Sequence, residues 1–197
     1  MSNLATAAPT TASRPGWQRI VLRWMVSFAG FPLGGFASII LTGPVNDLPA
    51  ALAGGLITGT VLGAVQVWAM GAARPRPMAW VLATAVGLMA GLGLGAALVD
   101  YQTDIGALAL QGAVCGAFVG AAQGVVLMPR LGSMAFAWPV ALSGIWALGW
   151  SITTAAGIKV EDQFTVFGSA GAIVATLLTA VLPILLNRHI HTEKSAS

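Results

Sequence analysis

The chain has 197 residues, of which 57% are hydrophobic and only 8% charged, and its mean hydropathy is +0.85. A water-soluble domain carries roughly a quarter charged residues, so this composition excludes an ordinary soluble enzyme or binding module and predicts a membrane protein. The formal net charge is +3, and the single cysteine excludes an internal disulfide framework.

The first segment, residues 1–16, is rich in Ala, Thr, Ser and Pro and has no hydrophobic periodicity. We therefore expect a disordered tail on the cytoplasmic side. A signal peptide is the competing interpretation, with Arg14 to Arg23 as its basic segment. It is disfavoured because the apolar stretch that follows is too long for a signal peptide and matches later parts of the chain.

Six apolar stretches follow this segment. Each has about 20 residues, enough for a helix to cross a hydrocarbon layer of about 30 Å. They cover 19–42, 49–71, 78–99, 104–128, 135–157 and 163–187. The connections are too short for a separate soluble domain, so we expect one transmembrane domain over 17–190 and a second cytoplasmic tail over 191–197.

Three acidic residues divide these stretches into pairs. Asp47 and Asp104 are 57 residues apart, and so are Asp104 and Glu161. Each lies between two apolar stretches, which indicates a hairpin of two transmembrane helices repeated three times. The predicted fold is an all-α membrane protein with a 57-residue repeat and pseudo-threefold symmetry. The repeats cover about 17–73, 74–130 and 131–188.

The basic residues predict the orientation of the chain. Eight of the nine fall on one side of a six-span arrangement: Arg14, Arg19, Arg23, Arg74, Arg76, Arg130, Arg188 and Lys194. By the positive-inside rule, both termini are cytoplasmic, and we expect a bacterial plasma membrane. The same residues contact anionic lipid headgroups. No basic stripe with interleaved aromatic residues is present, which argues against nucleic-acid binding.

Glycines recur at intervals of four residues in three of the stretches. They are Gly55, Gly59 and Gly63, then Gly87 and Gly91, then Gly112, Gly116 and Gly120. Such faces let helix backbones approach closely in lipid, which predicts glycine-zipper packing. The alternative is that one stripe contacts another membrane subunit, a second copy of the chain, or a flat apolar ligand.

Tryptophans and further glycines open the odd-numbered stretches. Trp24, Trp80 and Trp138 stand near the start of these stretches, with Gly30, Gly87 and Gly144 six or seven residues later. We interpret these tryptophans as anchors at headgroup depth.

The most informative polar side chains are Gln66 and Gln123, which are also 57 residues apart. Each follows a glycine of the stripe by three residues and therefore shares its face. Two interpretations stand: a structural hydrogen bond between helices, worth about 0.5–1 kcal/mol, or a pair of amides that recognises a ligand headgroup. Trp146 and Trp150, four residues apart, line a cavity or fill a seam and complete the candidate binding residues.

Catalytic and metal-binding patterns are weak. His189 and His191 have only Glu193 beside them, and Cys115 is far along the chain from any histidine base. No charged residue lies well inside an apolar stretch, although proton relays, ion-coupled transporters and intramembrane proteases require one. We expect neither a metal nor a cofactor.

The predicted function is therefore non-enzymatic: an integral membrane scaffold or accessory subunit, or a binder of an apolar ligand such as lipid. The alternative is a small-solute permease or channel, or the membrane-embedded binding subunit of a larger transporter. The two differ in whether Thr58, Thr60, Gln66 and Gln123 face a wet cavity or a dry seam.

Overall fold

The computed structural model describes residues 16–158 and 169–196. The predicted tail over residues 1–15 and the third acidic residue of the repeat, Glu161, lie outside these ranges. All regular structure in the described residues is helical. The elements in chain order are α1 (Trp17–Met25), η1 (Val26–Ala29), α2 (Gly30–Thr42), α3 (Leu48–Met70), η2 (Gly71–Ala73), α4 (Pro77–Leu98), α5 (Ile105–Leu131), η3 (Gly132–Phe136), α6 (Ala137–Ala155), α7 (Ser169–Thr179) and α8 (Val181–Ala196).

Five helices in the described ranges are long and apolar enough to cross a membrane. They cover Trp17–Thr42, Leu48–Ala73, Pro77–Leu98, Ile105–Ala155 and Ala170–Arg188. This confirms an all-helical protein with several membrane-capable helices. The fourth has 51 residues and contains α5 and α6, so the predicted count of six spans depends on how these two helices are arranged.

The two helices α5 and α6 lie against each other in opposite directions. Gly112, near the start of α5, faces the carbonyl of Trp146, whereas Gly120 faces Pro139 near the start of α6. The reversal occurs at Gly132, which has a φ of +54° after the end of α5. Only glycine adopts such a conformation readily.

Two of the acidic residues cap helices. Asp47 is the N-cap of α3 and accepts a hydrogen bond of 2.8 Å from the backbone N–H of Ala50. Asp104 is the N-cap of α5 and accepts from the N–H groups of Gly106 and Ala107, at 2.9 and 3.1 Å. A carboxylate at this position satisfies free N–H groups and complements the helix dipole. Local helix chemistry therefore accounts for both residues.

Two breaks in the helices, one between α1 and α2 and one between α7 and α8, each lie just before a proline. Pro32 lacks the N–H that the carbonyl four residues earlier would accept, and η1 interrupts the helix at that point. Pro183 likewise has no N–H to donate to the carbonyl of Thr179. The helix α7 ends at Thr179, and the chain continues as α8 from Val181. The last helix then continues to Ala196, through most of the segment predicted as a C-terminal tail.

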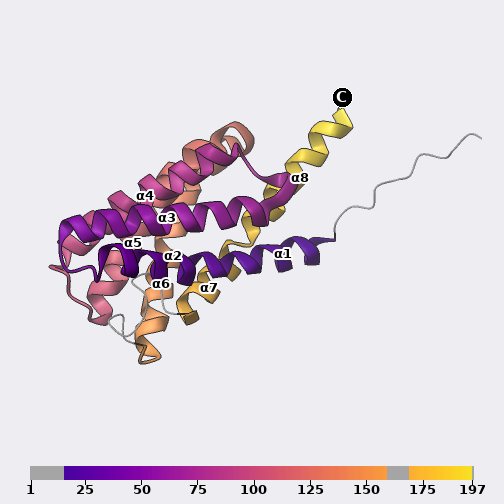
Figure 1. Ribbon diagram of the computed structural model, residues 1–197. Coiled ribbons are helices and arrows are strands. Elements are labelled where there is room, and N and C mark those ends of the chain that lie inside the picture. The colour runs from indigo at the N-terminus through magenta and orange to yellow at the C-terminus, as the bar shows by residue number, and fades with distance from the viewer. Residues whose placement is uncertain (1–15, 159–168, 197) are drawn as a thin grey trace, which may run out of the picture.

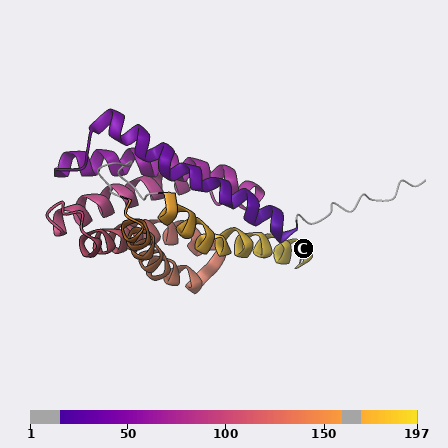
Figure 2. The same cartoon turned by 90° about the horizontal axis from the view of Figure 1, so that it is seen from below.

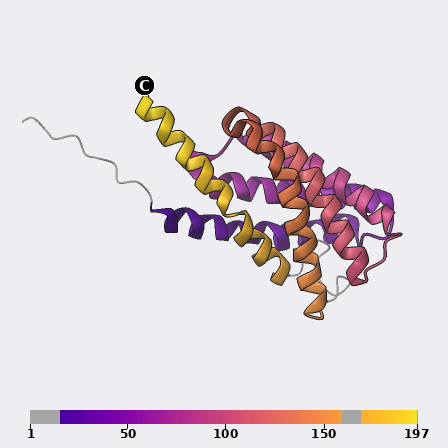
Figure 3. The same cartoon turned by 180° about the vertical axis from the view of Figure 1, so that it is seen from behind.

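The helices form a closed bundle in which the last helices return to the first. In chain order, α2 packs on α3, α3 on α4, α4 on α5, α5 on α6 and α6 on α7, and both α7 and α8 contact α1. The start of α1 and the end of α8 lie at the same end of the molecule (Figures 1 and 3). In the view from below, α7 and α8 run beside α1 and α2 (Figure 2).

Glycines lie where the backbones of neighbouring helices approach each other closely. The ideal Cβ of an added side chain at Gly59 on α3 would lie 2.7 Å from the Cα of Ala85 on α4. At Gly87 on α4 it would lie 2.7 Å from the Cα of Val119 on α5. Backbone atoms of the next helix also stand within 3.0 Å of such a Cβ at Gly55, Gly63, Gly91, Gly112, Gly116 and Gly120. These separations leave no room for a side chain.

Candidate functional site

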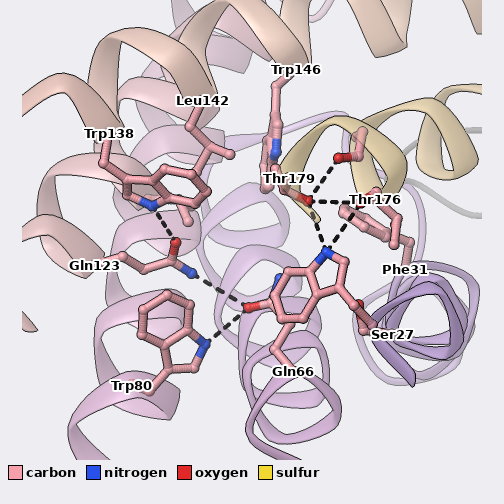
Figure 4. A pocket seen from close by; sticks show the side chains of 13 residues that line it. Ser27, Phe31, Gln66, Trp80, Gln123, Trp138, Leu142, Trp146, Thr176 and Thr179 are labelled. Atoms are coloured by element: carbon pink, nitrogen blue, oxygen red, sulfur yellow. Dashed lines mark hydrogen bonds between the residues drawn. The ribbon is translucent and has the colours of Figure 1, made fainter. Parts of the chain in front are cut away.

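The two candidate glutamines meet in the interior of the bundle. Gln66 lies on α3 and Gln123 on α5, and the Nε2 of Gln123 is 3.5 Å from the Oε1 of Gln66, at the outer limit of a hydrogen bond (Figure 4). Gln123 is 2% exposed, whereas Gln66 is half-buried. The fold thus places both amides in one cluster.

Each glutamine carbonyl accepts a hydrogen bond from a tryptophan. The indole N–H of Trp80 on α4 donates to Gln66 Oε1 at 3.0 Å, and that of Trp138 on α6 donates to Gln123 Oε1 at 2.9 Å (Figure 4). The amide of Gln123 also donates to Thr84 Oγ1 at 2.9 Å. Sequence reasoning assigned Trp80 and Trp138 to the membrane interface and missed these contacts.

A third tryptophan makes the corresponding contact where the bundle closes. The indole N–H of Trp24 on α1 reaches the backbone carbonyl of Thr176 at 3.1 Å and the Oγ1 of Thr179 at 3.2 Å, both on α7. Thr179 precedes Ala180, the position 57 residues after Gln123. Three indoles therefore join α4 to α3, α6 to α5 and α1 to α7.

We call Gln66, Gln123, Trp24, Trp80 and Trp138 the aromatic–amide cluster. This cluster is electrically neutral and well buried. Trp24 is 1% exposed and Trp80 is fully buried. A buried N–H without an acceptor costs about 1–3 kcal/mol, so each of these pairings avoids a substantial penalty. The chemistry that the cluster offers is hydrogen bonding, and its indoles and carbonyls already satisfy one another.

The space enclosed by the cluster is small. The volume open to the centre of a water-sized sphere is about 10 Å³, roughly what one water molecule needs. Trp146 lines this space with Phe31, and their rings pack edge to face at 5.9 Å. The space is too small for a lipid headgroup or an organic solute.

The other polar candidates lie elsewhere. Thr58 is fully buried between α2 and α3, beside Gly34, and its Oγ1 has no hydrogen-bond partner. Thr60 is exposed and donates to the carbonyl of Leu56 on its own helix at 2.7 Å. Trp150 does not line the cavity, because its ring packs against Gly112 in the seam between α5 and α6. These three residues therefore do not join the cluster.

The described ranges hold no group of three His, Cys, Asp or Glu side chains that would bind a metal ion. Cys115 is buried on α5, where the ideal Cβ of a side chain at Gly91 would lie 2.8 Å from its Cα. His189 and His191 lie on α8, but their side chains fall outside the described part of the chain.

Fold and cluster define the class of protein: an all-helical chain with membrane-capable helices around a hydrogen-bonded aromatic–amide core. Comparison with protein-family models, with curated proteins and with solved structures finds no match for this chain.

Proposed function

We propose that this chain is a non-enzymatic integral membrane protein with six spans, which acts as a scaffold or accessory subunit and takes membrane lipid as its ligand. The observation that carries the proposal is the central cluster, whose amides and indoles bind one another around space for about one water. A core of this kind holds helices together and leaves the outer faces for lipid or a partner.

The antiparallel arrangement of α5 and α6 supports the sixth span. As one straight helix, residues 105–155 would extend about 75 Å, far beyond a hydrocarbon core of about 30 Å. Folded back at Gly132, α6 alone has 19 residues and a length of about 28 Å. We therefore divide this helix into two spans.

Recurring contacts support the hairpin repeat. Gly30 contacts Leu62 and Gly34 contacts Thr58, and the same pairs recur 57 residues later as Gly87 with Val119 and Gly91 with Cys115. The contacts between hairpins recur in the same way. The pairs are Gly55 with Met89, Gly59 with Ala85 and Gly63 with Val81, then Gly112 with Trp146, Gly116 with Leu142 and Gly120 with Trp138.

Reporter fusions test the proposed topology. Fusions after Asp47, Asp104 and Glu161 should all report the outer side, because each lies between the two spans of one hairpin. Matched fusions after Arg74 and Arg130 should report the cytoplasm. A cytoplasmic signal at Asp104 together with an outer signal at Arg130 would contradict the six-span arrangement.

Transport by a permease or channel is the alternative that an experiment must separate from a scaffold. A solute pathway through the core would have to open the contacts among Gln66, Gln123 and the three indoles. We expect purified protein in liposomes to pass glycerol and urea no faster than protein-free liposomes do, as measured by stopped-flow light scattering. Saturable flux above that level would favour the permease and overturn the scaffold.

A scaffold also requires a partner. Native mass spectrometry of the protein extracted from its own membrane should show a stoichiometric second protein or a defined oligomer. A monomer without a protein partner, in a preparation that keeps its lipids, would contradict the scaffold proposal.

A further inference from the structure

Two basic pockets open at the end of the bundle where α1 begins and α8 ends. The first has a volume of about 330 Å³ and lies among α1, α8 and the end of α3, with Arg19, Arg23 and Asn187 in its lining. The second has a volume of about 310 Å³ and lies between the start of α4 and the end of α5, with Arg76 and Arg130 in its lining. Both volumes are within the range of small-ligand sites.

The two pockets correspond to each other along the chain. Arg19 and Arg76 are 57 residues apart, and so are Ala69 and Val126 of the respective walls. Each pocket therefore combines the start of one apolar stretch with the end of the next. A feature built twice in this way indicates one type of ligand bound twice.

One arginine of each pocket is held in place by backbone carbonyls. The Nη2 of Arg23 donates to the carbonyl of Trp68 at 2.6 Å, and its guanidinium lies 5.2 Å from the centre of the Trp68 ring. The Nη1 of Arg130 donates to the carbonyls of Ala73 and Arg74, at 2.8 and 3.0 Å. A guanidinium has five N–H donors, so both arginines retain donors for a ligand.

The side chain of the other arginine in each pocket has no partner among the described residues. Arg19 and Arg76 are exposed, and within the described ranges neither side chain makes a hydrogen bond or an ion pair. Among the described residues, no carboxylate lines either pocket. Each pocket therefore presents two positive charges to an anion.

Apart from the arginines, and Asn187 in the first pocket, no described lining residue has a polar side chain. Ala69, Met70 and Ile20 contribute to the first pocket, and Val125 and Val126 to the second. Arginine binds phosphate through paired N–H donors, while an apolar wall suits a glycerol backbone and the first methylenes of an acyl chain. Basic pockets between helices at the cytoplasmic surface bind anionic lipid headgroups.

We propose that each pocket binds the phosphodiester headgroup of one anionic phospholipid. The inference rests on the membrane position in the proposed function but not on the scaffold role. An inorganic phosphate would use the arginines alone, whereas a phospholipid also covers the apolar wall.

Native mass spectrometry in detergent tests this assignment with phosphatidylglycerol as the probe and phosphatidylcholine as the neutral comparison. We expect two retained phosphatidylglycerol molecules on the parent, one on Arg19→Gln, one on Arg76→Gln and none on the double variant. Arg188→Gln is the matched control, because it removes the same charge from an exposed site on α8 outside both pockets. It should retain two.

Three results would overturn the proposal. One is equal loss in Arg188→Gln, which would indicate attraction by net charge. Another is retention of both lipids by the folded double variant. The third is competition by glycerol phosphate at the same concentration as the lipid, which would assign the pockets to free phosphates. None of these results changes the liposome flux or the partner analysis, so failure here is distinct from failure of the scaffold role.

Discussion

Replacement of Gly116 by leucine is expected to prevent formation of a stable protein. The ideal Cβ at this position meets the carbonyl oxygen of Leu142, and it lies 2.7 Å from the carbonyl carbon of that residue and 2.8 Å from the Cα of Ser143. These are backbone atoms of α6, which cannot rotate away as a side chain would. Overpacking costs about 1–3 kcal/mol in ordinary cores and occasionally more, and we expect at least the upper value here. Thermal unfolding followed by fluorescence-detected size exclusion measures the loss.

The matched control is Gly144→Leu, on the partner helix of the same seam. Gly144 is exposed, and the ideal Cβ there has no atom within 4 Å. This variant should express and melt like the parent. Parental melting of Gly116→Leu would show that the seam between α5 and α6 is not closely packed. Equal loss in both variants would show that added leucine, rather than the backbone contact, is the cause.

Gly144 also shows how far spacing along the chain predicts packing. Sequence comparison aligned it with Gly30 and Gly87, both of which face the backbone of a neighbouring helix, yet Gly144 is exposed. The close contact of α6 instead involves Gly149 with Gly171. Gly144 follows Gly87 by 57 residues, and α6 keeps this register against α5, since the contact of Gly55 with Met89 recurs as that of Gly112 with Trp146. Spacing along the chain therefore places Gly144 correctly on α6 but does not determine where α7 packs against that helix.

The all-helical fold with several membrane-capable helices was predictable because the length of an apolar stretch is a local property of the chain. The site was only partly predictable. The period of 57 residues and the shared face placed Gln66 and Gln123 at matching positions, but their acceptor roles depend on the rotation of α4 and α6 about their axes. That rotation is set by the glycine contacts between helices, which are tertiary. The indole partners, Trp80 and Trp138, therefore emerged only from the fold.

The sequence does contain one indication of these indole–amide contacts, a similar separation along the chain between each glutamine and its tryptophan. Trp80 follows Gln66 by 14 residues, and Trp138 follows Gln123 by 15. Both intervals cross one short connection between antiparallel helices, which brings residues on either side to a similar depth. An indole N–H can only donate, and the side-chain carbonyl of glutamine can accept. The two groups at the same depth in the membrane on adjacent helices therefore indicate a hydrogen bond. Trp24 lacked this signal because its acceptors on α7 are 152 and 155 residues away in the chain.

The second large effect is expected from Gln66→Leu. An interhelical hydrogen bond in a membrane protein is worth about 0.5–1 kcal/mol, which was the sequence-based expectation. The structure raises the expected loss in the free energy of unfolding, because Trp80 is fully buried and its N–H loses its acceptor in this variant. A buried unpaired donor costs about 1–3 kcal/mol, so we expect a loss of about 2 kcal/mol. Gln102→Leu, in the exposed turn before α5, should be neutral.

A double-mutant cycle separates the hydrogen bond from the loss of shape. Trp80→Phe removes the N–H, so Gln66→Leu should cost markedly less in that background than in the parent. Additive losses would mean that the indole and the amide do not interact. The variants should also retain both phosphatidylglycerol molecules, because the cluster and the basic pockets share no residue. A folded Gln66→Leu variant that has lost its lipid would instead favour the second interpretation of the glutamines, recognition of a ligand headgroup.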